Sequence, residues 1–246
     1  MFRPLTGKLH ELQDKYPERI RRLESIFDTP TIVYIDFGNV YRWQAKLGWH
    51  IDLKRLKHLF DGFETIREVK FYNGTLTGDA NSEKIIKDAG EYGYTVITKP
   101  VKWMKLEIDV TGIPADSPEV LKRFISASLI RKFNLDTIVY LNERLRELNR
   151  QGIVHIDELK CNFDVEIGRD IYLDHRDRKA ETYVLWSGDS DFVDPIRHLL
   201  EDGKKVVLFA TVRRVAKELS ELRSAGLQLF DIQKLREFIC WPRENR

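Results

Sequence analysis

Apolar residues in this chain gather in five short runs, separated by longer segments that have helical spacing. The runs are TIVYID (31–36), EVKFYNG (68–74), YTVITK (94–99), TYVLWSGD (182–189) and KVVLFA (205–210). Their Val, Ile and aromatic residues are typical of strands that are buried on both faces. Because helical segments alternate with these runs, the pattern predicts an α/β fold with a mainly parallel sheet covered by helices.

The segments between the runs repeat apolar residues every three or four positions. Residues 51–63 place four of them on one helical face, namely Leu53, Leu56, Leu59 and Phe60. Residues 81–93 predict another helix. After the fifth run, residues 211–226 predict a helix, 227–232 can form an edge strand, and 234–239 predict a last helical turn.

Two regions stand outside this rhythm. Residues 1–29 predict a helical N-terminal lead-in, followed by a single domain at 30–240. Residues from about 102 to 158 form an insertion that we expect to be mostly helical. Within it, VLKRFISASLIRKF (120–133) predicts an amphipathic helix, whereas 136–152 suits either a strand followed by a helix or one long helix.

Composition narrows the class of protein. The 246 residues are 42% hydrophobic and 11% aromatic, which indicates an ordered protein. The net charge is only +2, so any affinity for nucleic acid must come from local patches. Two cysteines, Cys161 and Cys240, favour a reducing compartment and give no zinc motif. No run resembles a signal peptide or approaches the roughly 20 apolar residues of a membrane span, so we expect a cytoplasmic protein without a membrane partner.

Acidic residues follow the first and fourth predicted strands. Asp36 ends the first strand, and Asp189 and Asp191 follow the fourth in WSGDSDF. Ligands of open parallel sheets bind beyond the carboxyl ends of the strands, where the strand order reverses. If the first and fourth strands are neighbours there, these acids converge, and a helix predicted from about Phe163 would add Asp164.

Several carboxylates in one place need a cation. Two of them about 4 Å apart repel by roughly 4 kcal/mol at an effective dielectric constant of 20. Mg²⁺ or Mn²⁺ takes oxygen ligands and can support hydrolysis of a phosphodiester. Each acid also has an ordinary explanation, as a helix cap, a turn residue or a first-turn acid. Their joint placement at one edge of the sheet favours the metal site.

Three segments resemble a known family. YIDFGNVY (34–41), KCNFDVEIGRD (160–170) and WSGDSDFVDPIRHLLEDGKKV (186–206) are similar to the NYN domain, in the LabA-like (DUF88) branch of the PIN-like nuclease superfamily. The resemblance covers residues 30–99 and 155–235. It implies a three-layer α/β/α, Rossmannoid PIN-like fold with a mainly parallel five-stranded sheet in the order 3-2-1-4-5. The implied function is metal-dependent hydrolysis of RNA, with an endoribonuclease favoured and single-stranded or loop RNA as substrate.

The resemblance also implies roles for individual residues. By position, the ligands of Mg²⁺ or Mn²⁺ and their catalytic companion are Asp36, Asp164, Asp189, Asp191 and Asn39. Asp170 fits a family position that either contacts the metal or supports its ligands. Lys160 resembles the lysine of the family motif and is a candidate for binding an RNA phosphate.

Further RNA-binding candidates come from the residues themselves. Lys99, Lys102 and Lys105, with Trp103 among them, can follow a single-stranded backbone and stack a base. An equally good interpretation packs Trp103 within the insertion and leaves the lysines solvated. Arg213 and Arg214 are weaker candidates. The six histidines show no ligand spacing, so none is assigned to a metal.

Other functions remain open from the sequence. The main alternative is a catalytically silent NYN-type module that binds RNA or a protein. A Toprim-like nuclease would need glutamate at Asp36, and a haloacid-dehalogenase-like phosphatase would need aspartate at Gly38, so both fit less well. Since PIN-like proteins often associate, a homo-oligomer is an expected partner state, with the insertion as its interface.

Overall fold

The chain forms two compact units. The computed structural model describes residues 1–125, 127–211 and 215–240. Unit 1 consists of Met1–Pro100 and Cys161–Arg246, and unit 2 is Val101–Lys160. One cluster of buried apolar side chains fills unit 1, and its described members all come from that unit. The hydrophobic core of unit 1 therefore contains residues that precede unit 2 in the sequence and residues that follow it.

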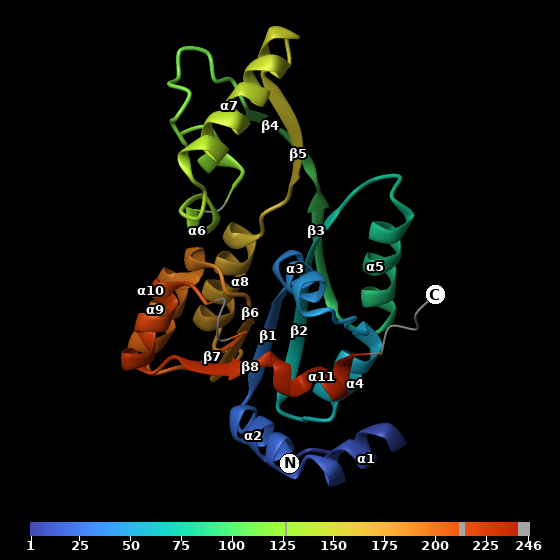
Figure 1. Cartoon of the computed structure of the whole chain (residues 1–246). Coiled ribbons are helices and arrows are strands. Elements are labelled where there is room, and N and C mark those ends of the chain that lie inside the picture. Colours follow the sequence, from blue (N-terminus) through green and yellow to red (C-terminus); the bar gives the residue numbers. More distant parts are fainter. Residues whose placement is uncertain (126, 212–214, 241–246) are drawn as a thin grey trace. The chain divides into compact units, whose positions relative to one another are not determined.

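A parallel sheet of six strands is the centre of unit 1 (Figure 1). Its order is β3-β2-β1-β6-β7-β8. The strands are β1 (Thr31–Asp36), β2 (Ile66–Thr75), β3 (Thr95–Pro100), β6 (Thr182–Trp186), β7 (Lys205–Ala210) and β8 (Gln228–Asp231). The expectation of five strands is wrong by one, because β8 adds an edge beside β7. The five expected strands keep their expected relative order, so the complete order differs at that edge only.

The strand order places the switch point next to β1. From β1 the chain builds β2 and β3 on one side, and later builds β6, β7 and β8 on the other. β1 pairs in parallel with both β2 and β6. The carboxyl ends of β1 and β6 therefore lie side by side, which is where open parallel sheets bind their ligands.

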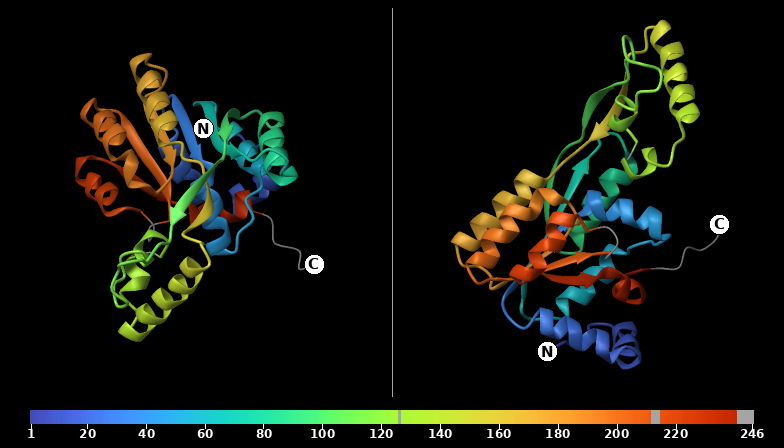
Figure 2. Two further views of the ribbon diagram at one scale, coloured as in Figure 1. Left: turned by 90° about the horizontal axis from the view of Figure 1, so that it is seen from above. Right: turned by 60° about the vertical axis from the view of Figure 1, so that its left-hand side comes forward.

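Helices cover both faces of this sheet. They are α1 (Gly7–Lys15), α2 (Pro17–Ile26), α3 (Phe37–Leu47), α4 (Leu53–Asp61), α5 (Ala80–Glu91), α8 (Asp164–Arg176), α9 (Val193–Glu201), α10 (Lys217–Glu221) and α11 (Arg236–Ile239). α8 and α9 lie side by side (Figures 1 and 2). The helix predicted within residues 51–63 is confirmed as α4, which begins after its cap Asp52 and buries all four predicted apolar residues.

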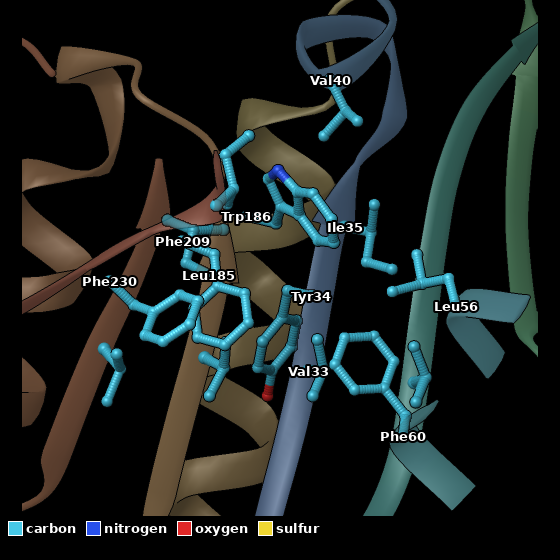
Figure 3. Packing of buried hydrophobic residues seen from close by; sticks show 14 of the residues in the cluster. Val33, Tyr34, Ile35, Val40, Leu56, Phe60, Leu185, Trp186, Phe209 and Phe230 are labelled. Carbon is cyan, nitrogen blue, oxygen red and sulfur yellow. The ribbon is translucent and has the colours of Figure 1, made fainter. Parts of the chain in front are cut away.

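Opposite faces of β1 contact different helices. Val33 and Ile35 point to the side where Leu56 and Phe60 of α4 pack (Figure 3). Tyr34 points to the other side, and its hydroxyl donates a hydrogen bond to the carboxylate of Asp174 in α8. Because successive side chains of β1 point to opposite faces of the sheet, this one strand packs against helices on both sides.

Unit 2 has its own secondary structure. β4 (Lys102–Glu107) pairs antiparallel with β5 (His155–Lys160). The remaining elements described in this unit are a 3₁₀ turn (Leu121–Arg123), α6 (Ala127–Ile130) and α7 (Leu135–Arg150). The insertion is therefore only partly helical. The open choice for residues 136–152 is settled, because α7 is one long helix.

The amphipathic helix predicted over residues 120–133 is wrong in the part that the structure describes. The chain there forms a 3₁₀ turn and the four-residue α6 instead. The segment just before it is held to α7 by Asn142, whose amide donates to the carbonyl oxygens of Ala115 and Ser117, both at 2.7 Å. Apolar spacing and helix propensity are therefore not sufficient for one continuous helix in this segment.

Within the described ranges, no helix is both long enough and apolar enough to cross a membrane.

Candidate metal centre

Asp36 stands where β1 ends and α3 begins. It is the N-cap of α3, and its Oδ1 accepts a hydrogen bond from the backbone N–H of Asn39 at 3.3 Å. Its Oδ2 accepts a second hydrogen bond from the hydroxyl of Ser187 at 3.2 Å. Since Ser187 directly follows β6, these contacts join the ends of the two central strands.

Ser187 organises this junction. It is completely buried, and its hydroxyl oxygen accepts hydrogen bonds from Asn39 Nδ2 at 3.1 Å and from the backbone N–H of Asp189 at 3.3 Å. Sequence reasoning missed this residue, although it lies inside the quoted WSGDSDF motif. Its role becomes visible only once β1 is known to lie beside β6.

Asp189 is both a cap and a neighbour of the other acids. Its Oδ1 accepts a hydrogen bond from the backbone N–H of Asp191 at 3.3 Å, which caps the short 3₁₀ turn Ser190–Phe192. Its charge also contributes to raising the pKa of Asp36 and of Asp164. Asp189 therefore interacts with acids from β1 and from α8 at once.

Asp164 opens α8 and brings a third element to the site. Its backbone N–H donates to Asn162 Oδ1 at 3.0 Å, which fixes the start of the helix. Burial raises the pKa of the Asp164 carboxyl group to about 6, and the nearby carboxylates of Asp191 and Asp189 act in the same direction. Asn162 alone opposes this shift.

Asp36 has a raised pKa for similar reasons. Burial raises it first, hydrogen bonds from Asn39 and Ser187 lower it, and the charge of Asp189 raises it again. Burial thus raises the pKa of both acids most, and the charge of Asp189 adds to the effect.

These residues suit a hard divalent cation. All four candidate ligands offer carboxylate oxygen, which Mg²⁺ and Mn²⁺ prefer. The Oδ2 atom of Asp164 is buried and has no hydrogen-bond partner among the described residues. A cation would satisfy that oxygen and stabilise the ionised forms of Asp36 and Asp164, which burial and the neighbouring carboxylates disfavour.

The carboxylate oxygens of these acids lie further apart than ligand atoms around a bound ion. Within the described part of the chain, ligand atoms that all lie within 4.8 Å of one another occur at a different group, formed by His175, His198 and Asp202. Carboxylates that lack a counter-ion repel one another. Mg²⁺ also keeps several waters, so it does not require direct contact with every acid.

Asp170 lies further along α8 and has structural partners. Its Oδ2 accepts a hydrogen bond from the hydroxyl of Tyr72 at 2.9 Å, and its Oδ1 pairs with Arg169 at 2.8 Å. The hydrogen bond from Tyr72 holds α8 against β2. Both carboxylate oxygens of Asp170 therefore have protein partners, and its role at the metal site stays a prediction.

The basic candidates fall into two groups. Lys99 belongs to unit 1, where its Nζ pairs with Glu166 Oε1 at 2.6 Å. Lys102, Trp103, Lys105 and Lys160 belong to unit 2. Lys102 lies directly opposite Lys160 in the β4–β5 ladder. Arg213 and Arg214 lie outside the described residues.

Trp103 is largely open to solvent. Its exposed fraction is 66%, and it lies opposite Leu159 in the ladder. The interpretation that packs this ring within the insertion is therefore wrong, and the ring is accessible for stacking.

Comparison with known proteins supports a family and a fold for this chain. The NYN domain model matches residues 108–233, just over half of the chain, which include Asp164, Asp189 and Asp191. The low amplitude and bright protein LabA of Synechococcus elongatus is 24% identical over 208 residues, covering 84% of this chain and 86% of that protein.

A solved structure shares the fold. It is a protein of unknown function from Vibrio parahaemolyticus, with a TM-score of 0.51 and 16% identity, covering 85% of this chain and 94% of that one. At this identity the likeness concerns the fold alone.

Proposed function

Because this chain belongs to the NYN domain family, we propose that it is a metal-dependent ribonuclease that hydrolyses phosphodiester bonds of RNA at the acids around Ser187. The NYN domain belongs to a nuclease superfamily, which supports a reaction of this class. The observation that carries the proposal is the buried Oδ2 of Asp164, which lacks a hydrogen-bond partner among the described residues and lies beside other carboxylates. A divalent cation is the group that such an oxygen needs.

The acids have distinct parts in this proposal. Asp36, Asp164 and Asp189 would hold Mg²⁺ or Mn²⁺, and Asp191 would bind the ion directly or through water. The bound ion supplies charge that neutralises the scissile phosphate and lowers the pKa of water. Ser187 and Asn39 hold the carboxylate of Asp36 in place through the hydrogen bonds described above.

Unit 2 is the proposed RNA-binding element. Like charges directly opposite in a two-stranded ladder destabilise it unless an anion lies between them. Lys102 and Lys160 form such a pair, and the exposed ring of Trp103 offers a stacking surface on the same strand as Lys102. Because side chains alternate along a strand, the two lysines share one face of the ladder and the ring of Trp103 lies on the other. A strand of RNA that wraps around the ladder would meet both positive charge and a stacking ring, a combination typical of proteins that bind single-stranded nucleic acid.

The decisive experiment combines substrate, metal and variants. Labelled RNA and matched DNA are incubated with the protein in Mg²⁺, Mn²⁺ or EDTA. We expect cleavage of RNA that requires metal, and its loss by at least about 100-fold in Asp36→Asn and Asp189→Asn, since each lost ligand removes several kcal/mol of transition-state stabilisation. Asparagine caps helices as well as aspartate does, so both variants should stay folded.

Asp194→Asn is the matched control. Asp194 is an exposed acid in the first turn of α9 that pairs with Arg197 at 2.7 Å. It should leave cleavage unchanged. Cleavage at the wild-type rate by Asp36→Asn or Asp189→Asn in Mn²⁺ would end the proposed mechanism. Binding of RNA by the wild type without any cleavage would favour the catalytically silent module instead.

A further inference from the structure

We propose that His175, His198 and Asp202 form a separate site for a late transition-metal ion such as Zn²⁺ or Co²⁺, at the adjoining C-terminal ends of α8 and α9. The potential ligand atoms of these three residues all lie within 4.8 Å of one another. The site lies apart from the acids around Ser187 in residue content and donor chemistry, and it does not depend on the proposed nuclease function.

The distances suit a small ion. His175 Nε2 lies 2.6 Å from Asp202 Oδ2, and His198 Nε2 lies 3.9 Å from the same oxygen. Tetrahedral zinc with bonds of about 2.0–2.1 Å separates its donor atoms by roughly 3.3 Å, which lies between these two distances. The side chains of His198 and Asp202 are 51% and 47% exposed, so small rotations can equalise the spacing.

The backbone that carries these ligands is well defined. His198 and Asp202 are four positions apart at the end of α9, so they share one helical face. His175 comes from the last turn of α8, which packs beside α9. The ring of Tyr172 stacks on His198 with centroids 6.4 Å apart and restricts its orientation.

The electrostatics also favour a cation. Two helix C-terminal ends meet here, and each presents partial negative charge from its free carbonyl groups. Two imidazole nitrogens and one carboxylate oxygen select Zn²⁺, Co²⁺ or Ni²⁺ over Mg²⁺.

One position remains for an outside ligand. Three protein ligands leave the fourth tetrahedral position of zinc to water or another molecule. Both histidines also line an open hollow of about 360 Å³, whose apolar walls include Ile171, Pro195 and Leu199. A small ligand with an apolar body could occupy that hollow while it binds the ion.

Hydrogen bonds to the metal-binding histidines limit the affinity of the proposed site for Zn²⁺ or Co²⁺. A histidine that binds metal usually donates its second ring N–H to an acceptor. Nδ1 of His175 is buried without a hydrogen-bond partner among the described residues. We therefore expect binding about 10- to 100-fold weaker than at a site with a complete outer shell, so the titration should extend through the micromolar range.

Titration of the full chain with Co²⁺ and Zn²⁺ tests the site. The starting protein carries Asp36→Asn and Asp189→Asn, so that the acids around Ser187 contribute little. Co²⁺ should give the visible absorption bands of a tetrahedral site, and Zn²⁺ should raise the unfolding temperature in a saturable way. Excess Mg²⁺ should not displace Co²⁺, because Mg²⁺ avoids imidazole ligands.

Two further variants decide the assignment. His198→Ala in the same background should abolish both the absorption bands and the saturable shift. His10→Ala removes an exposed histidine of α1 and should leave both unchanged. The proposal is overturned if the starting protein shows neither signal, or if His198→Ala retains them, since the three residues would then form only a hydrogen-bonded surface cluster.

Discussion

Asp164 links the charge of the proposed metal site to pH. Burial and neighbouring acids raise its pKa from 3.8 to about 6 in the folded chain. Between these values the folded state binds more protons than the unfolded state, so stability falls as the pH rises through this window. In EDTA, the wild type should lose stability relative to Asp164→Asn between about pH 4 and about pH 6, as measured by thermal unfolding.

Metal should reverse this trend. Because ligands must be deprotonated, stabilisation by Mn²⁺ should grow as the pH rises through about 6 in the wild type and be weaker in Asp164→Asn. Asp194→Asn, which changes an exposed first-turn acid of α9, should follow the wild type. Parallel pH curves for the wild type and Asp164→Asn would show that this carboxylate does not carry the effect.

Single residues also show what the sequence could reveal about the site. Asp36 and Asp189 end strands that the apolar runs make visible, so their meeting follows from strand order. The hydrogen bonds of Ser187 depend on side-chain directions that no spacing rule gives. The spacing of the histidines in the sequence likewise gave no sign of the group formed by His175, His198 and Asp202. His175 lies in α8, whereas the other two residues lie at the end of α9.

Helix α8 is attached to the sheet by two carboxylates one turn apart. Asp170 accepts from Tyr72, while Asp174 accepts from Tyr34 at 2.7 Å and pairs with the buried Nζ of Lys70 at 2.5 Å. Burial alone would raise the pKa of Asp174, but hydrogen bonds from Lys70, Lys179 and Tyr34 bring it below its ordinary value. The ionised form therefore stabilises the fold, and this stabilisation is lost as the pH falls through the lowered pKa.

Asp174→Asn should destabilise unit 1 strongly. It leaves Lys70 buried without its main counter-charge, which costs about 3–5 kcal/mol, and the lower end applies because Glu68 still lies 3.9 Å from Lys70. Chemical denaturation would measure the loss. Asp177→Asn is the control, because that exposed acid pairs with Arg176 at the surface and should change little. Equal stability of both variants would show that Asp174 is not an anchor.

The β4–β5 ladder allows a test of RNA binding. If Lys102 and Lys160 each contact a phosphate, replacing both with alanine should reduce the slope of log affinity against log salt by about 1.4 for single-stranded RNA. Lys8→Ala is the control, since Lys8 is an exposed lysine of α1 that pairs with Glu11 at 2.9 Å and lies outside the ladder. An unchanged slope in the double variant would remove this ladder from the proposed RNA path.

Elements differ in how well their sequence predicts them. The four apolar residues of α4 share one face, and local pattern and tertiary burial agree there. In residues 120–133 they disagree, since the apolar spacing suits one amphipathic helix but the described chain forms a 3₁₀ turn and the short helix α6. The edge strand β8 has only four residues, Gln228–Asp231, so the apolar pattern alone could not separate it from a turn.

At the scale of the whole molecule, unit 1 should fold without unit 2. Its buried cluster, within the described residues, takes no member from 101–160, and it combines chain from before and after that segment. The two ends of the interruption are close, since Cys161 Sγ lies 4.0 Å from the carbonyl oxygen of Lys99. A short, flexible Gly-Ser linker can therefore replace unit 2 with little strain.

This deletion separates the two proposed roles. Unit 1 retains Asp36, Asp164, Asp189 and Asp191, so the shortened chain should unfold cooperatively and keep its stabilisation by Mn²⁺. It should bind RNA more weakly and with a smaller salt dependence, because Lys102, Trp103 and Lys160 are gone. Unchanged RNA affinity would place the binding surface on unit 1. A shortened chain that loses cooperative unfolding would show that unit 1 depends on contacts beyond its own buried core, since its metal ligands and core residues are all still present.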